Sequence, residues 1–257
     1  MSITRRAGLL DRLRIEGGVA RSLLQRLRSR HGVWRDRLLA RFVGPNDLVF
    51  DIGAHVGDCV ASLRRLGARV VAVEPQPALV RSLRLLHGKD PAVVIEPVAV
   101  GACQAAGRLY QNRANPTVST LSRDFVAAAD GALGWRDQQW DAELEVDVTT
   151  LDALIERHGV PRFCKIDVEG YEAEVLRGLS DPLPSLSFEF TTIQSAVARH
   201  ALAECERLGS YAYNAALGAE SRLQHLEWLD SEAMALWIER LPAEANSGDV
   251  YAVRREP

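Results

Sequence analysis

Apolar and polar positions alternate along the chain in a way that predicts strands and helices in turn from residue 47 onward. Short apolar runs at 48–52 and 69–74 are typical of strands buried on both faces. Helical patterns follow them at 57–66 and 77–87, and a third strand is expected within 92–100. Strands and helices that alternate at this spacing form a parallel sheet with right-handed crossovers.

The alternation continues in the second half of the chain. Helices are expected at 150–158, 170–179 and 195–208, with strands at 162–168 and 184–190 between them. Further extended pieces are expected at 108–111, 143–148, 211–215 and 249–253. No internal repeat interrupts this pattern, so we predict a single doubly wound, mostly parallel α/β domain over residues 47–257.

Residues 1–46 show a different, purely helical pattern. Leucines at helical spacing predict two short amphipathic helices, at 7–16 and 19–30, interrupted at Gly17-Gly18. A third helix is expected at 33–42. We therefore predict a helical N-terminal extension that caps the main domain.

Charge is distributed unevenly between these two units. The net charge is −3, yet residues 1–41 contain eleven arginines and three acidic residues. Such a segment is suited to anionic lipid, nucleic acid or an acidic partner, but we favour a solvated helical face that packs on the acidic remainder of its own chain. It lacks interleaved aromatic residues that would stack on bases, so no nucleic-acid partner is expected. Peripheral membrane contact and the oligomeric state are left open.

The composition predicts a globular protein of the cytoplasm. Apolar residues make up 47% and charged residues 25% of the chain. We expect no transmembrane helix, because no apolar run reaches about 18 residues, and no secretory signal. The spacing of the four cysteines fits neither a zinc site nor a disulfide framework, so they are expected to be reduced thiols. No metal site is predicted.

The first candidate for chemistry is the segment F-D-I-G-A-H-V-G-D at 50–58. Asp51 closes a buried strand, and Gly53 and Gly57 flank the turn into a helix. We expect Gly53 to let the backbone approach a ligand where a Cβ would clash. In doubly wound sheets, ligands bind at this carboxyl end of the strands.

An acid at the end of the next strand completes a nucleoside-binding pattern. Glu74 lies 21 residues after Gly53, where a carboxylate can accept hydrogen bonds from both ribose hydroxyls. A dinucleotide fold would place a glycine at His55 to admit a pyrophosphate. This departure favours a cofactor without phosphates, such as S-adenosylmethionine, over a nicotinamide dinucleotide. A nicotinamide-dependent oxidoreductase and a non-catalytic cofactor-binding protein remain alternatives.

A second acidic segment, C-K-I-D-V-E-G-Y-E at 164–172, leaves the fourth strand. It places Asp167 and Glu169 at the strand end, and Glu189 stands in the apolar fifth strand. Two acids at a helix N-terminus are also stabilised by the helix dipole. We hypothesise that Asp167 or Glu189 orients and deprotonates an acceptor hydroxyl, and Glu169 and His55 are further candidates for the base. The same acids could hold a divalent cation, but their spacing matches no known metal-binding loop.

Taken together, these segments resemble the FkbM family of methyltransferases. The resemblance rests on V-F-D-I-G-A-H-V-G (49–57), V-A-V-E-P (71–75), V-T-T-L-D-A-L (148–154) and K-I-D-V-E-G-Y-E-A-E-V-L-R-G (165–178). It spans about residues 47–190, and D-V-Y-A at 249–252 is similar to the family's closing strand.

The resemblance implies a Rossmann-like class I methyltransferase fold, a seven-stranded sheet whose last strand is antiparallel. It implies S-adenosylmethionine as donor and a hydroxyl acceptor on a sugar, glycan, lipid-linked or polyketide-type molecule. The implied cofactor-binding residues are Asp51, Gly53, Ala54, His55, Gly57, Glu74, Pro75 and Ala99. The family commonly has asparagine where this chain has His55.

Overall fold

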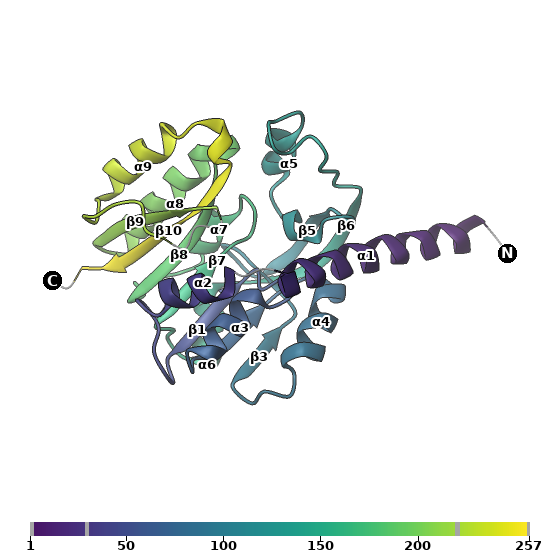
Figure 1. Ribbon diagram of the computed structural model, residues 1–257, viewed down its shortest axis with the longest axis horizontal. Coiled ribbons are helices and arrows are strands. Elements are labelled where there is room, and N and C mark those ends of the chain that lie inside the picture. Colours follow the sequence, from purple (N-terminus) through teal and green to yellow (C-terminus); the bar gives the residue numbers. More distant parts are fainter. Residues whose placement is uncertain (1–2, 29–30, 219–221, 256–257) are drawn as a thin grey trace.

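The computed structural model describes residues 3–28, 31–218 and 222–255, which form a seven-stranded sheet between two layers of helices (Figure 1). Its strand order is β3-β2-β1-β7-β8-β10-β9. β10 runs antiparallel to both of its neighbours, and the other pairs are parallel. The strands are β1 (Leu48–Ile52), β2 (Arg69–Val73), β3 (Val93–Glu96), β7 (Phe163–Ile166), β8 (Ser185–Thr191), β9 (Tyr211–Leu217) and β10 (Ser247–Arg254). The predicted doubly wound, mostly parallel sheet is confirmed.

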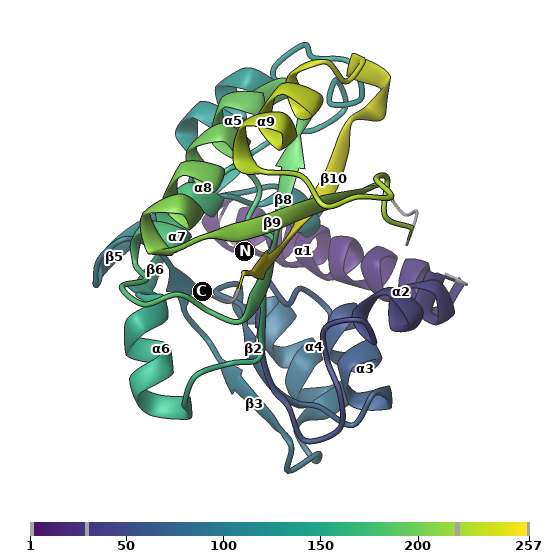
Figure 2. The same cartoon turned by 90° about the vertical axis from the view of Figure 1, so that its left-hand side faces the viewer.

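Helices cover both faces of this sheet (Figure 2). One face carries α2 (His31–Leu39), α3 (Asp58–Arg65) and α4 (Pro77–His87). The opposite face carries α6 (Leu151–His158), α7 (Glu172–Arg177), α8 (Ser195–Leu208) and α9 (Ser231–Glu239). The sequence pattern did not reveal α9, which starts where the side chain of Asp230 accepts a hydrogen bond from the backbone amide of Ala233.

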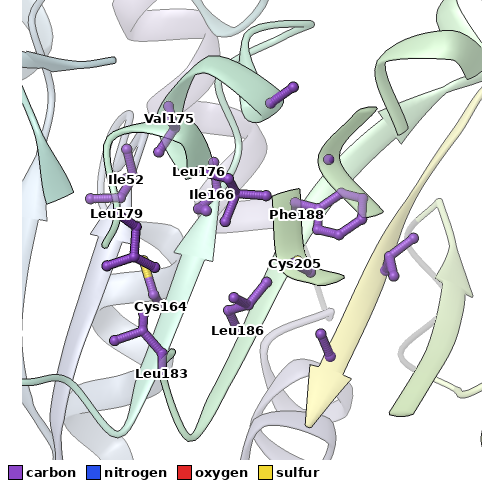
Figure 3. Close-up of a cluster of buried hydrophobic side chains, with 14 of the residues drawn as sticks. Ile52, Cys164, Ile166, Val175, Leu176, Leu179, Leu183, Leu186, Phe188 and Cys205 are labelled. Atoms are coloured by element: carbon purple, nitrogen blue, oxygen red, sulfur yellow. The ribbon is translucent and has the colours of Figure 1, made fainter. Parts of the chain in front are cut away.

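The main core lies between the central strands and the helices α7 and α8 (Figure 3). Ile52, Ile166 and Phe188 come from the three neighbouring strands β1, β7 and β8 and are almost fully buried. Val175 and Leu176 of α7 close over them. This packing fixes the carboxyl ends of the three strands relative to one another.

A smaller three-stranded sheet stands beside the main one. It consists of β4 (Ala99–Val100), β5 (Ala105–Gln111) and β6 (Ala142–Thr149) in the order β4-β6-β5. The third strand expected within 92–100 is confirmed as β3. The chain then leaves the main sheet and continues as β4 in the small sheet, which the sequence pattern did not predict.

The polar connection between β5 and β6 is a packed structure of its own. It contains the 3-10 helix η1 (Pro116–Val118) and the helix α5 (Arg123–Ala129), which the sequence pattern did not predict. The ring of Phe125 meets that of Trp135 edge to face at 5.0 Å. The indole of Trp140 donates to the carbonyl of Val118 at 2.8 Å. These contacts pack the connection into a small core of its own.

The N-terminal extension begins with one long helix, α1 (Ile3–Arg28), not the two short helices expected. Positions 29–30 of the second expected helix lie outside the described residues. Gly17 and Gly18 do not interrupt α1, although each costs about 1 kcal/mol relative to alanine in a helix. A Cβ on Gly18 would lie 2.5 Å from the carbonyl oxygen of Arg113, so this glycine lets α1 pack closely on the segment before η1.

The end of the extension shares a core with the α/β domain. Phe42 is 7% exposed and stacks on Phe163 of β7 and on Tyr251 of β10, with ring centroids 5.4 Å and 5.2 Å apart. Leu38 and Leu39 of α2 belong to the same buried cluster. Among the described helices, none is both long and apolar enough to cross a membrane.

Candidate functional site

A cavity of about 370 Å³ opens at the carboxyl ends of β1, β2, β7 and β8. Most of the residues singled out from the sequence line it, although they are far apart in the chain. These are Asp51, Gly53, Ala54, His55, Glu74, Pro75, Ala99, Asp167 and Glu189. Gly57 and Glu169 are not among the lining residues.

The loop between β1 and α3, residues 53–57, is called the first loop, and its two glycines allow close packing within the protein. Gly53 has φ +83°, and a Cβ there would lie 1.8 Å from the carbonyl oxygen of Asp167. Gly57 also has φ +83°, and a Cβ there would lie 2.8 Å from Nε2 of His87 on α4. Gly53 was expected to make room for a ligand. In the structure it makes room for the backbone of Asp167, where the end of β1 packs against the end of β7.

Glu74 is buried at the end of β2 and organises the loop beside it. Its Oε1 accepts a hydrogen bond from the amide of Gln76 at 2.9 Å, and its Oε2 accepts one from the amide of His55 at 3.1 Å. Burial raises the pKa of Glu74 to about 7. Each oxygen keeps a lone pair for a further donor that enters the cavity.

Asp51 is fully buried at the end of β1, beside Lys165 of the neighbouring strand β7. Within the described residues neither of its carboxylate oxygens accepts a conventional hydrogen bond; the thiol of Cys59 is a weak donor, and the ammonium of Lys165 acts on the carboxylate through its charge. Burial raises the pKa of Asp51. A buried carboxylate without donors is costly, so this residue calls for a donor or a cation from a bound molecule.

Three acids meet at the ends of β7 and β8. One carboxylate oxygen from each of Asp167, Glu169 and Glu189 lies within 4.8 Å of the others. Lys165 donates to Oδ2 of Asp167 at 2.7 Å. Burial alone would raise the pKa of Asp167, but the ammonium of Lys165 holds it below its ordinary value. Burial and the charge of Asp167 raise the pKa of Glu189 well above its ordinary value.

His55 faces the cavity from the turn after β1. Burial lowers its pKa to about 4, so the imidazole is neutral near pH 7. Its Nε2 lies 3.2 Å from Oγ1 of Thr117 in η1. The imidazole thereby links the loop after β1 to the segment that connects β5 and β6.

Several lining residues were missed by sequence reasoning. Gln76 donates from Nε2 to the carbonyl of Pro116 at 3.0 Å and so anchors η1 at the cavity. Asp249 opens β10 opposite Glu189, and burial raises its pKa to about 6. The sequence contained a signal for Asp249, because an acidic residue near the start of an otherwise apolar strand is unusual. Arg35 of α2 also lines the cavity, and nothing in the sequence distinguishes it from the other arginines nearby.

Comparison with known sequences gives two matches. The sequence profile described as the methyltransferase FkbM domain matches residues 51–222. The hexuronic acid methyltransferase AglP of Haloferax volcanii is 27% identical over 165 residues, which cover 63% of this chain. The matched part spans 62% of that relative's own length.

Solved structures give more distant likenesses. The precorrin-6y C5,15-methyltransferase of Geobacter metallireducens has a TM-score of 0.43 and 12% identity, covering 86% of this chain and 87% of that one. Fibrillarin of Aeropyrum pernix with natively bound S-adenosyl-L-methionine has a TM-score of 0.43 and 11% identity, covering 82% and 68%. TM-scores of this size do not align individual site residues.

Proposed function

The chain belongs to the FkbM methyltransferase domain family, and from that premise we propose that it transfers a methyl group to a hydroxyl of a sugar-type acceptor. The observation that carries this proposal is one cavity shared by the two cofactor candidates, Asp51 and Glu74, and the acids Asp167 and Glu189. A donor site and an acceptor site can then lie next to each other, as direct group transfer requires.

The cofactor is S-adenosylmethionine, which supplies an electrophilic methyl group on a sulfonium. The residues of the first loop fit this molecule. Glu74 would accept hydrogen bonds from the ribose hydroxyls, for which its two oxygens retain lone pairs. Asp51 lacks a strong donor of its own and would meet the ammonium of the methionine part. Pro75 and Ala99 would flank the adenine.

The acids at the ends of β7 and β8 would serve the acceptor. A hydroxyl must lose its proton as it attacks, and a positioned base contributes roughly 10²–10⁴-fold to such a step. Asp167 suits this role better than Glu189, because Lys165 keeps it ionised while burial favours the protonated form of Glu189. Alignment of the acceptor oxygen with the methyl group can contribute roughly 7–11 kcal/mol more.

The sugar-type acceptor is suggested by the relative that acts on a hexuronic acid. The cavity supports it with polar side chains that can bind several hydroxyls at once. Arg35, Thr117, Ser187 and Asp249 all line it. The acceptor could be a free sugar or part of a glycan, a lipid-linked glycan or a polyketide-type glycoside.

The test combines binding with product analysis. Calorimetry of the full chain should show binding of S-adenosylmethionine and of its demethylated product, and no binding of a nicotinamide dinucleotide. Glu74→Gln and Asp51→Asn should each weaken cofactor binding at least tenfold, because each replaces a carboxylate, which accepts through both oxygens, by a neutral amide with one accepting oxygen. Glycan and lipid extracts incubated with labelled donor should gain methyl groups on sugar hydroxyls, as seen by mass spectrometry.

Two results would overturn the proposal. Absence of heat with either form of the cofactor would remove the donor site. Cofactor binding without methyl transfer to any extract would instead indicate a cofactor-binding protein that is not an enzyme. Asp167→Asn that retains full turnover would remove Asp167 as the base.

A further inference from the structure

Two of the three acids at the ends of β7 and β8 lack a cation in the described part of the chain. Asp167 is paired with Lys165 through Oδ2 at 2.7 Å. Glu169 is only 6% exposed, and its Oε2 is buried without a hydrogen-bond partner. Oε2 of Glu189 is likewise buried without a partner. Each of these two glutamates therefore has a buried carboxyl oxygen that accepts no hydrogen bond within the described residues.

The neighbouring titratable groups Glu172, Asp249 and His55 add no cation to this cluster. Glu172 faces them as a further acid, and its Oε1 is occupied by the amides of Val168 and Gly170. Asp249 lies opposite Glu189 on β10 and adds another carboxylate. His55 nearby is neutral near pH 7. A divalent cation would give both glutamates the charged partner that they lack among the described residues.

The geometry suits such an ion. The three carboxylate oxygens lie within 4.8 Å of one another. Oxygen ligands of Mg²⁺ are about 3 Å apart when adjacent and about 4 Å apart when opposite, given bonds of roughly 2.0–2.1 Å, so small side-chain movements bring the three oxygens onto one ion. Glu169 is held in position by its backbone, which has φ +56° and whose carbonyl accepts a hydrogen bond from Oγ1 of Thr120 at 2.7 Å.

We propose that Asp167, Glu169 and Glu189 bind one divalent cation, Mg²⁺ or Mn²⁺, at the acceptor side of the cavity. All three ligands are carboxylate oxygens, which hard divalent cations prefer. Asp167 and Glu189 line the cavity, so the remaining coordination positions face it and are open to water or to a ligand oxygen. If the proposed function holds, an acceptor oxygen takes one of these positions, and the ion draws electron density from it before transfer.

The test is direct binding of Mn²⁺ to the full chain after removal of metals with a chelator. Electron paramagnetic resonance should show one bound Mn²⁺ per chain, displaceable by Mg²⁺. Glu169→Gln and Glu189→Gln should each weaken Mn²⁺ binding at least tenfold, because each removes a ligand charge. Both variants should melt no lower than the metal-free wild type, since each reduces repulsion between buried acids.

Glu172→Gln is the matched control. It removes one charge from the same neighbourhood, yet a glutamine carbonyl at the position of Oε1 can still accept from both amides that Glu172 binds. Mn²⁺ affinity should change by less than about threefold in this variant. Equal losses of Mn²⁺ affinity in Glu172→Gln and Glu169→Gln would mean that Mn²⁺ binds to the general negative charge of this region, and they would overturn the proposed site.

Binding of the demethylated cofactor separates this inference from the proposed function. A folded chain that binds the demethylated cofactor but no Mn²⁺ at millimolar concentration overturns the cation site and leaves the proposed function intact. Carboxyl groups that share protons would then account for the cluster. One bound Mn²⁺ that depends on Glu169, with no methyl transfer to any acceptor, supports the cation site and counts against the proposed function.

Discussion

At the scale of single residues, Gly53 shows how closely the strand ends approach each other. Alanine at this position would have to adopt φ +83° and would place its Cβ 1.8 Å from the carbonyl of Asp167. We expect Gly53→Ala to lower the free energy of unfolding by at least about 3 kcal/mol, because strain and overlap add. Gly131, with φ +71° and nothing within 4 Å of a Cβ, is the matched control.

Urea unfolding of both variants measures the difference. Gly131→Ala retains only the backbone strain and should cost about 1 kcal/mol. Equal losses in the two variants would show that the contact between the ends of β1 and β7 does not constrain Gly53. Cofactor binding should fall in Gly53→Ala alone, since any shift of Asp167 alters the cavity.

Glu74 should make the cofactor-free protein less stable as the pH rises. Burial raises its folded pKa from 4.5 to about 7. Below pH 4.5 the carboxyl is protonated in both states, and its full contribution to stability is present. Between pH 4.5 and about 7 the unfolded chain releases the proton first, so stability is lost, on the order of 3 kcal/mol in all.

Comparison with Glu74→Gln isolates this effect. The variant loses a hydrogen bond at every pH, but its stability relative to the wild type should rise between pH 4.5 and 8. Chemical unfolding at several pH values gives this difference. Glu143→Gln, at a side chain 55% exposed, should show no such trend. A flat difference for Glu74→Gln would mean that Glu74 is ionised in the folded protein at all these pH values.

At the scale of elements, α1 and the segment before η1 stabilise each other. Arg113 forms ion pairs with Asp11 of α1 and, at 3.1 Å, with Asp141. Val19 of α1 packs in a buried cluster with residues of the first loop and α4. Because Pro116 and Thr117 line the cavity, the N-terminal extension supports one wall of the candidate site.

The two neighbouring glycines of α1 provide the test. A Cβ on Gly17 meets nothing within 4 Å, whereas one on Gly18 would lie 2.9 Å from Cδ of Pro116 in addition to its contact with Arg113. Gly17→Ala should therefore stabilise the protein by up to about 1 kcal/mol through helix propensity. Gly18→Ala should lower stability, speed trypsin cleavage after Arg14 and Arg21 of α1 by loosening the helix, and weaken cofactor binding. Equal changes in stability and cofactor binding in the two variants would exclude close packing of α1 on Arg113 and Pro116.

At the scale of the whole molecule, the N-terminal extension and the sheet share one core through Phe42. Phe42→Ala should cost about 3–5 kcal/mol, because it opens a cavity between Phe163 and Tyr251. Trp34→Ala is the control, since Trp34 is 57% exposed on α2 and should lose no more than about 1 kcal/mol. Thermal unfolding followed by circular dichroism measures both. A small loss at Phe42 would indicate that residues 1–46 fold apart from the main domain.

The sequence by itself determined the order of the main strands and helices. Runs such as Leu48–Ile52 are apolar because both of their faces are buried, and this periodicity is local information. It also placed Asp51 and Glu74 at strand ends, because the carboxyl ends of parallel strands share one edge. From these local patterns the sheet and most of the cavity lining followed.

Only the tertiary structure decided which groups meet. The helix α1 continues through Gly17 and Gly18 because the gain from packing on Arg113 outweighs the cost of glycine, and that contact joins residues about a hundred positions apart. Arg35 and Asp249 enter the cavity from α2 and from an antiparallel strand, which no local pattern links to it. The packing of Glu169 against Asp167 and Glu189 likewise depends on β7 and β8 lying side by side. Distances across a fold depend on how the whole chain packs, and sequence periodicity does not record them.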